Sequence, residues 1–184
     1  TQMKKSKRII KKKERNKSHG IFVKILLGIF LLIAALFIIR LLTPSHLDDV
    51  HPDIQCDDEL LQKTDIFYVI PKFSGVNISD DTLWCARILS YNKTLAIHGV
   101  YHTYKEFGTD RDESYIQEGA EEFKKCFGFY PNRFKAPQTK LSAGNKDLLK
   151  AKGYRIDTLF ADLFHKVYHC DDGGYYPNWI SDLV

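Results

Sequence analysis

The sequence lacks the short motifs that would identify a metal site or an enzyme class directly. No two of its four cysteines have the Cys-x-x-Cys spacing of a structural zinc site. It contains no His-Glu-x-x-His, so a zinc protease of that type is not indicated. There is no internal repeat and no low-complexity segment beyond a basic N-terminal tail. A catalytic site would therefore have to combine residues that are distant in the sequence.

Acidic residues are nearly absent from the first 44 residues, which contain one acid, Glu14, and eleven lysines and arginines. This segment carries a formal charge of +10. Because the whole chain carries +4, the remaining 140 residues carry −6. Nucleic-acid binding needs positive charge on a folded surface, and here that charge belongs to the tail. The sequence therefore does not support nucleic acid as a partner.

Residues 21–42 are almost entirely apolar, with Lys24 and Arg40 near the two ends. About 20 such residues cross a bilayer. The positive charge before them predicts a cytoplasmic N-terminus and a domain outside the cytoplasm or in a lumen. A cleaved signal peptide is the alternative, but no small-x-small cleavage site follows. A buried core helix fits less well, because the run is apolar on all sides.

We therefore expect three parts in this single-pass membrane protein. A basic cytoplasmic tail without regular structure covers residues 1–20, a transmembrane helix acting as signal anchor covers 21–42, and a folded domain covers 44–184. An even number of cysteines in an oxidising compartment indicates up to two disulfides, with three possible pairings. Single buried thiols are the alternative. The four residues concerned are Cys56, Cys85, Cys126 and Cys170.

Short apolar strands alternate with helices in the folded domain. Strands are predicted at 66–70, 94–97, 133–136 and 154–160, and helices at 57–63, 79–92, 113–127 and 142–152. This alternation is typical of a parallel α/β sheet or barrel with its helices outside. In such folds the chemistry gathers at the C-terminal ends of the strands.

Two pairs of residues stand where that rule places the chemistry. Asp48 and Asp49 precede the first strand–helix unit, and His98 and His102 follow the strand at 94–97. Two imidazoles and one carboxylate leave open positions on Zn²⁺ or another divalent ion. The second carboxylate can then take a proton from a water molecule. A His-x-x-x-His pair without metal, on a helix face or in a loop, is the alternative.

The acidic pair lies only a few residues after the apolar run. Either the active site is close to the bilayer, or the apolar helix ends early and its last residues form the first strand.

Three segments together resemble the polysaccharide deacetylase (NodB-homology) superfamily. They are residues 46–52 (HLDDVHP), residues 98–107 (HGVYHTYKEF) and residues 134–137 (FKAP). The first two are most similar to an uncharacterised branch with the motifs Asp-Asp-Val-His-Pro and His-Gly-x-x-His, the latter followed by Glu-Phe. The resemblance extends over about residues 47–159.

This resemblance implies a distorted (β/α) barrel and the hydrolysis of an N-acetyl group on a sugar. It implies Asp48 as the catalytic base and Asp49, His98 and His102 as ligands of a divalent metal, with Zn²⁺ favoured. The oxyanion would be held by the metal and a backbone N–H. Lys135 stands where many members have an arginine that braces the base. Substrate contacts are expected from Tyr101, Glu106 and Pro137.

The late motifs of the superfamily have no clear match. Asp157 or Asp162 could replace the aspartate of an Asp-Trp segment, and His165 or His169 could replace a general-acid histidine. We assign the general acid to His165, while solvated polar residues on a helix are the alternative for both histidines.

We expect a membrane-anchored, metal-dependent carbohydrate deacetylase that acts outside the cytoplasm. About 140 residues are few for a full barrel, so we expect an incomplete one that lacks a last strand. The alternative is a degenerate relative that binds a glycan or a partner protein without catalysis. A third interpretation is an amidase or esterase with the same site. The oligomeric state is not indicated.

Overall fold

The computed structural model describes residues 2–174 and 177–183, with side chains from residue 20 onward. It divides into two compact units, Thr1–Ile39 and Arg40–Val184. Helix α1 (Gln2–Leu42) contains both the basic stretch and the apolar run. The expectation that residues 1–20 lack regular structure is therefore wrong for residues 2–20. Lysine, arginine and glutamate are good helix formers, and no proline interrupts them.

The segment Gly20–Leu42 has a mean hydropathy of 3.0 in its most apolar window, none of which is buried. By length and composition it is able to cross a membrane. The helix does not end early to form the first strand, because α1 reaches Leu42 and the first strand begins at His46.

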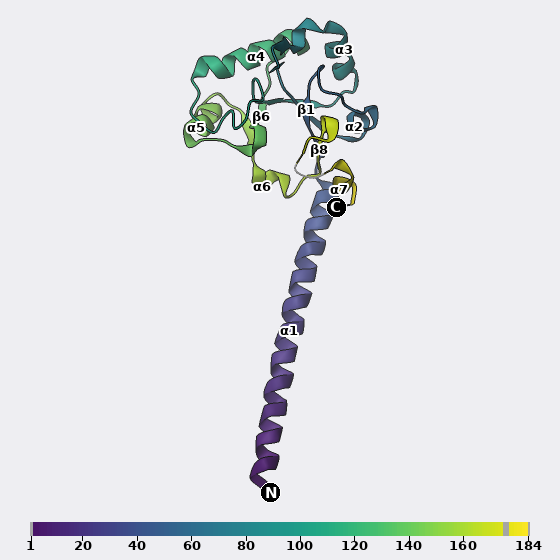
Figure 1. Cartoon of the computed structure of the whole chain (residues 1–184), viewed down its shortest axis with the longest axis vertical. Helices are drawn as coiled ribbons and strands as arrows, with labels where there is room; N and C mark the ends of the chain where they lie inside the picture. The colour runs from purple at the N-terminus through teal and green to yellow at the C-terminus, as the bar shows by residue number, and fades with distance from the viewer. Residues whose placement is uncertain (1, 175–176, 184) are drawn as a thin grey trace. The chain divides into compact units, whose positions relative to one another are not determined.

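Six parallel strands form the sheet of the second unit, in the order β7-β6-β5-β2-β1-β8. They are β1 (His46–Val50), β2 (Ile66–Val69), β5 (Thr94–His98), β6 (Arg133–Lys135), β7 (Arg155–Asp157) and β8 (Val167–His169). Every residue of β2 is buried, as in a parallel sheet covered on both faces. The sheet curls into a half-barrel, which confirms the predicted α/β barrel-type fold (Figure 1).

Helices lie around this sheet (Figure 1), and one short hairpin follows β2. The α-helices are α2 (Asp58–Lys63), α3 (Thr82–Ser90), α4 (Glu113–Phe127), α5 (Ala143–Ala151), α6 (Leu159–Asp162) and α7 (Asn178–Leu183). The 3-10 helices are η1 (Ile78–Asp80), η2 (Pro137–Thr139) and η3 (Cys170–Asp172), and the antiparallel hairpin joins β3 (Lys72–Phe73) to β4 (Val76–Asn77). The helix predicted at 113–127 has the predicted bounds, begins after an Asp112 cap and ends at Gly128.

The prediction for residues 154–160 is wrong in its second half. Strand β7 stops at Asp157, and the chain turns into α6 at Leu159. Strand β8 was not predicted, and it pairs with β1 at one edge of the sheet. Its three residues are too few to show a hydrophobic period.

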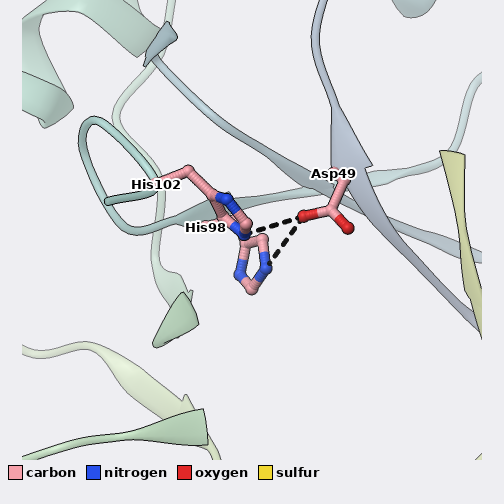
Figure 2. Close-up of side chains that lie close together, drawn as sticks. All are labelled: Asp49, His98 and His102. Carbon is pink, nitrogen blue, oxygen red and sulfur yellow. Dashed lines mark ion pairs between the residues drawn. The ribbon is translucent and has the colours of Figure 1, made fainter. Parts of the chain in front are cut away.

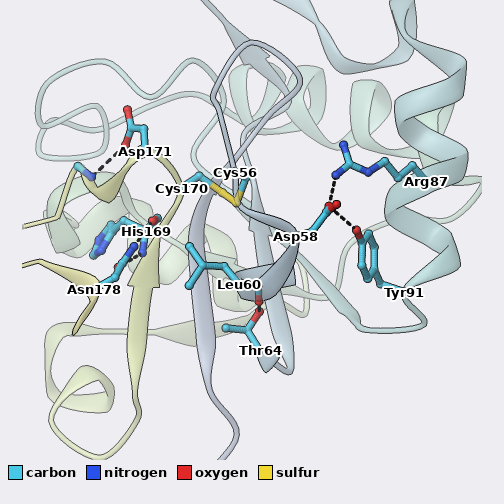
Figure 3. The surroundings of a disulfide bond; sticks show 11 residues. Cys56, Asp58, Leu60, Thr64, Arg87, Tyr91, His169, Cys170, Asp171 and Asn178 are labelled. Carbon is cyan, nitrogen blue, oxygen red and sulfur yellow. Dashed lines mark hydrogen bonds and ion pairs between the residues drawn. A yellow bond between two sulfur atoms is a disulfide. The ribbon is translucent and has the colours of Figure 1, made fainter. Parts of the chain in front are cut away.

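Both expected disulfides are present, and they select one of the three pairings. Cys56 is joined to Cys170, and Cys85 to Cys126. The first bond connects the segment after β1 to η3, directly after β8 (Figure 3). The second connects α3 to α4.

Candidate metal centre

Asp49, His98 and His102 converge at the C-terminal ends of β1 and β5 (Figure 2). Asp49 Oδ1 lies 2.9 Å from His102 Nε2 and 3.5 Å from His98 Nε2. One ligand atom from each residue lies within 4.8 Å of the other two. The structure thus brings together the three side chains that were predicted to hold a metal.

A bulge in β1 allows both carboxylates to serve one site. Successive side chains of a strand point to opposite faces, so a regular strand would separate Asp48 from Asp49. The pairing of β1 with β2 shifts its register between Leu47 and Val50, and Asp49 has φ 63°. Bulges re-aim side chains in this way, and aspartate tolerates the left-handed region better than most residues.

His98 is oriented by a backbone hydrogen bond. It ends β5, is 3% exposed, and its Nδ1 lies 3.0 Å from the carbonyl oxygen of Lys135. Because a carbonyl only accepts, Nδ1 carries the proton and Nε2 keeps its lone pair. Nε2 is the atom that faces Asp49. Metal-binding histidines commonly have this arrangement.

His102 is positioned by the carboxylate of Glu106. This buried group accepts hydrogen bonds from the backbone N–H groups of Val100, Tyr101 and His102, at 2.9 to 3.2 Å. It also accepts the Tyr115 hydroxyl hydrogen at 2.6 Å. A bound carboxylate therefore fixes the shape of the loop that carries His102.

Gly99 makes that arrangement possible. It has φ 68°, and a Cβ at this position would overlap the Glu106 carboxylate and lie 2.7 Å from Pro137 Cγ. A side chain here would displace the group that holds the loop.

Asp48 and Asp162 share one buried cation, Lys135. Lys135 Nζ lies 2.7 Å from Asp48 Oδ2 and 3.0 Å from Asp162 Oδ1. Burial acts to raise the pKa of Asp48, but the positive charge of Lys135, with the His98 and His169 imidazoles nearby, outweighs it and holds that pKa below its usual value. Burial raises the pKa of Asp162 despite Lys135. The pKa values of the two carboxyl groups are thus shifted in opposite directions, and Asp48 is the stronger acid of the two.

The donor set fits a divalent metal. Burial acts to raise the pKa of Asp49, but the adjacent His102 and His98 side chains outweigh it and hold that pKa well below its usual value, so the carboxylate is charged. Its buried Oδ1 has no hydrogen-bond partner in the described part of the chain. Two imidazole nitrogens and one carboxylate oxygen suit Zn²⁺ and similar ions, with positions left for water and substrate.

A cavity of about 340 Å³ opens beside these residues. Its walls include Asp48, Asp49, His98, His102, Tyr104, Lys135, Gln138, Leu159, Asp162 and His169. Three residues expected to contact substrate lie outside this lining. Glu106 is buried under its loop, the Tyr101 hydroxyl is bonded to Glu118, and Pro137 packs next to Gly99.

His165, to which we assigned the general acid, also lies outside the lining. Its Nδ1 is 2.7 Å from the carbonyl oxygen of Pro44, and its ring stacks on His46 near the start of β1. His169 lies beside Asp48 instead. It stands opposite Asp48 in the β1–β8 pairing, and its Nε2 lies 3.6 Å from Asp48 Oδ2.

Asn178 fixes the backbone of His169. The His169 N–H donates to the Asn178 amide oxygen at 2.9 Å, and the amide nitrogen donates to the His169 carbonyl oxygen at 2.7 Å (Figure 3). Of the two aspartates considered for the late motifs, Asp162 reaches Lys135. Asp157 pairs with Arg133 outside the cavity lining.

No protein-family model and no curated protein matches the sequence. Solved structures with a similar fold were found. A peptidoglycan N-acetylglucosamine deacetylase matches 61% of this chain and 54% of its own with a TM-score of 0.50 and 14% identity. The fold is that of the polysaccharide deacetylases. This confirms the fold class that the resemblance implied.

Two other similar structures differ in activity. The chitin deacetylase of the fungal pathogen Colletotrichum lindemuthianum is 16% identical, with a TM-score of 0.47 over 76% of this chain and 65% of its own. A CE4 family pseudoenzyme from Bacillus anthracis is 11% identical, with a TM-score of 0.40 over 62% of this chain and 47% of its own. In each of the three comparisons the chain spans less than two thirds of the solved structure.

Proposed function

We propose that this chain is a membrane-anchored, metal-dependent hydrolase that removes N-acetyl groups from a carbohydrate outside the cytoplasm. The observation that carries the proposal is the convergence of Asp49, His98 and His102 on a cavity wall next to the Lys135-paired Asp48. The deacetylase fold and the motif resemblance support it. Membership of the superfamily, and of its uncharacterised branch, is part of the proposal.

The site residues have separate roles in the proposed reaction. A divalent ion such as Zn²⁺, when bound to Asp49, His98 and His102, supplies a Lewis acid that acidifies water and polarises the acetyl carbonyl. Asp48 takes the proton of the water whose oxygen bonds to the acetyl carbon. Because Lys135 keeps Asp48 ionised, the base is available at neutral pH.

The carbon–nitrogen bond breaks when the sugar nitrogen receives a proton. We assign this proton to His169 rather than His165, because His169 lines the cavity beside Asp48. The products are acetate and a sugar amine.

We propose that α1 anchors the protein through residues 21–42. The excess of positive charge before this segment favours a cytoplasmic N-terminus and a domain on the other side of the membrane. Two disulfides in the folded unit are consistent with an oxidising compartment.

The first experiment compares variants of the full chain in detergent. Asp48→Asn should abolish acetate release from N-acetylated chito-oligosaccharides while keeping about one bound metal ion per chain. His98→Ala should lose the ion. Asp147→Asn, on the exposed face of α5, is the matched control and should keep both properties.

Elemental analysis and enzymatic detection of acetate provide the two readouts. A wild-type protein that holds no metal after loading with Zn²⁺, Co²⁺ or Mn²⁺ would refute the enzyme proposal. Retained activity in Asp48→Asn would refute the base assignment. A wild type that binds metal but releases no acetate from any acetylated saccharide would favour the non-catalytic binding alternative.

A further inference from the structure

The outward surface of α6 and the residue after it is apolar. Leu159, Phe160 and Leu163 are 61%, 68% and 55% exposed, and we call these three side chains the α6 face. The only charged residue of the helix, Asp162, turns inward to Lys135 and its side chain is 16% exposed. A surface helix in water normally shows the opposite pattern, with its charged side chains outside.

The α6 face lies beside the point where the chain leaves the apolar run. Arg40 Nη1 donates a hydrogen bond to the carbonyl oxygen of Leu163 at 3.4 Å, and Thr43 Oγ1 donates to that of Phe164. These contacts lie within one compact unit, Arg40–Val184. Since Arg40 is only two residues from the end of the run at Leu42, a bilayer crossed by that run has its interface at Arg40. The α6 face must then lie near the same interface.

We propose that the α6 face inserts into the interfacial region of the bilayer that holds α1. This rests on the anchoring role given to α1 in the proposed function. Leu42, the last residue of the apolar run, is 81% exposed within the same unit. Arg40, which bonds to the Leu163 carbonyl group, can extend its guanidinium to the lipid headgroups at this end of the apolar run.

A protein partner fits this surface less well. A stable protein interface buries about 800 Å² on each side and uses about 20 or more residues, far more than the α6 face provides. A few apolar side chains are enough to hold a surface that a covalent anchor already keeps at the bilayer.

Insertion of the α6 face would also fix the position of the cavity relative to the bilayer. Leu159 belongs both to the α6 face and to the cavity wall, and Asp162 of the same helix pairs with Lys135 behind Asp48. The wall of the cavity that contains Leu159 then lies at the membrane surface. The sequence left open whether the active site is close to the bilayer or the apolar helix ends early. Insertion of the α6 face corresponds to the first of these, with the site close to the bilayer.

The test measures the depth of single tryptophans in the full chain reconstituted in phosphatidylcholine vesicles. Phe160→Trp replaces one exposed aromatic ring by another on the α6 face. Leu83→Trp, on α3, is the matched control: Leu83 is 83% exposed, and Figure 1 shows α3 and α6 at opposite ends of the folded unit. Wild-type protein supplies the background of Trp84 and Trp179.

Lipids brominated on their acyl chains should quench the added fluorescence of Phe160→Trp at least twofold more than that of Leu83→Trp. Leu163→Trp repeats the measurement at a second position, in case Phe160→Trp fails to fold. Equal quenching on α6 and α3 would overturn the proposal, as would a chain that does not float with the vesicles. Because no acetate or metal is measured, a failed deacetylase assay leaves this result unaffected.

Discussion

Lys135 is the residue on which the charge of the site depends. It is 1% exposed and lies between the carboxylates of Asp48 and Asp162. A buried ammonium group persists only when it is paired, and its removal leaves the partner charges without compensation. The sequence showed this residue as a lysine in place of the usual arginine. The structure shows that a lysine reaches both acids from the end of β6.

Replacing Lys135 by methionine should shift the pH dependence of activity. In the wild type Lys135 holds the pKa of Asp48 down against burial. Without Lys135, burial raises the pKa of Asp48, so the acidic limb of kcat/KM against pH should move to higher pH by about one to three units. Lys150→Met, exposed on α5, should leave the limb in place. An unchanged limb in Lys135→Met would contradict the pairing.

The same variant should be less stable by about 3–5 kcal/mol at neutral pH, because a buried carboxylate loses its partner. A carboxyl with a depressed folded-state pKa contributes stability above its unfolded pKa, and that contribution is lost as the pH falls through the folded value. The difference from wild type should therefore shrink on acidification. Denaturant unfolding at several pH values measures it.

At the scale of elements, the loop after β5 is built around one carboxylate. Glu106 receives backbone hydrogen bonds from three consecutive residues, 100 to 102, and thereby fixes His102. Sequence patterns do not reveal such a role, because a buried glutamate beside a metal motif looks the same as one that contacts substrate. Only the fold shows that its oxygens face the loop's own N–H groups.

Glu106→Gln should weaken metal binding. The amide keeps one acceptor oxygen but directs an NH₂ group toward backbone donors, which leaves buried N–H groups without partners. We expect about a 10- to 100-fold loss of Zn²⁺ affinity, as found when groups that orient metal ligands are removed. Competition titration with a chelator measures it. Glu59→Gln, an exposed change on α2, is the control, and equal affinities for both variants would disprove the role of Glu106.

Elements with a clear period were predicted well, and those without one were not. Ile116, Ala120, Phe123 and Phe127 recur on one face of α4 and are all buried, so that helix was predicted with its bounds. Strand β1 was not predicted, because Asp48 and Asp49 interrupt its apolar pattern; the two acids lie within this strand and not before the first strand–helix unit. Strand β8 owes its place to pairing with β1, which is a tertiary contact and leaves no local pattern.

The same distinction applies to the site. The spacing of His98 and His102 after a buried strand and the adjacent acids pointed to three residues that do converge. His165 and His169 were both candidates for the general acid, and their local sequences did not separate them. What separates them is the strand register, which places His169 opposite Asp48 and leaves His165 near Pro44.

At the scale of the whole molecule, two disulfides close loops of different length around different parts of the fold. Cys56 and Cys170 are 114 residues apart, and Cys85 and Cys126 are 41 apart. Loop-closure entropy assigns about 4–5 kcal/mol to the longer loop and about 4 kcal/mol to the shorter. The two bonds therefore stabilise the fold to similar extents, and only their positions predict a difference in function.

Removing the first disulfide should cost activity as well as stability. Cys170 follows His169 directly, and an Asp171 N–H donates to the Gln55 carbonyl oxygen beside the bond. Cys56→Ser with Cys170→Ser should free η3 and misplace His169, so acetate release should fall at least tenfold at a temperature where the protein is folded. The Cys85–Cys126 bond is not adjacent to a site residue. Its removal by Cys85→Ser with Cys126→Ser should therefore lower only the unfolding free energy. Equal losses of activity in the two double variants, each shown to be folded by circular dichroism, would remove His169 from the proposed mechanism.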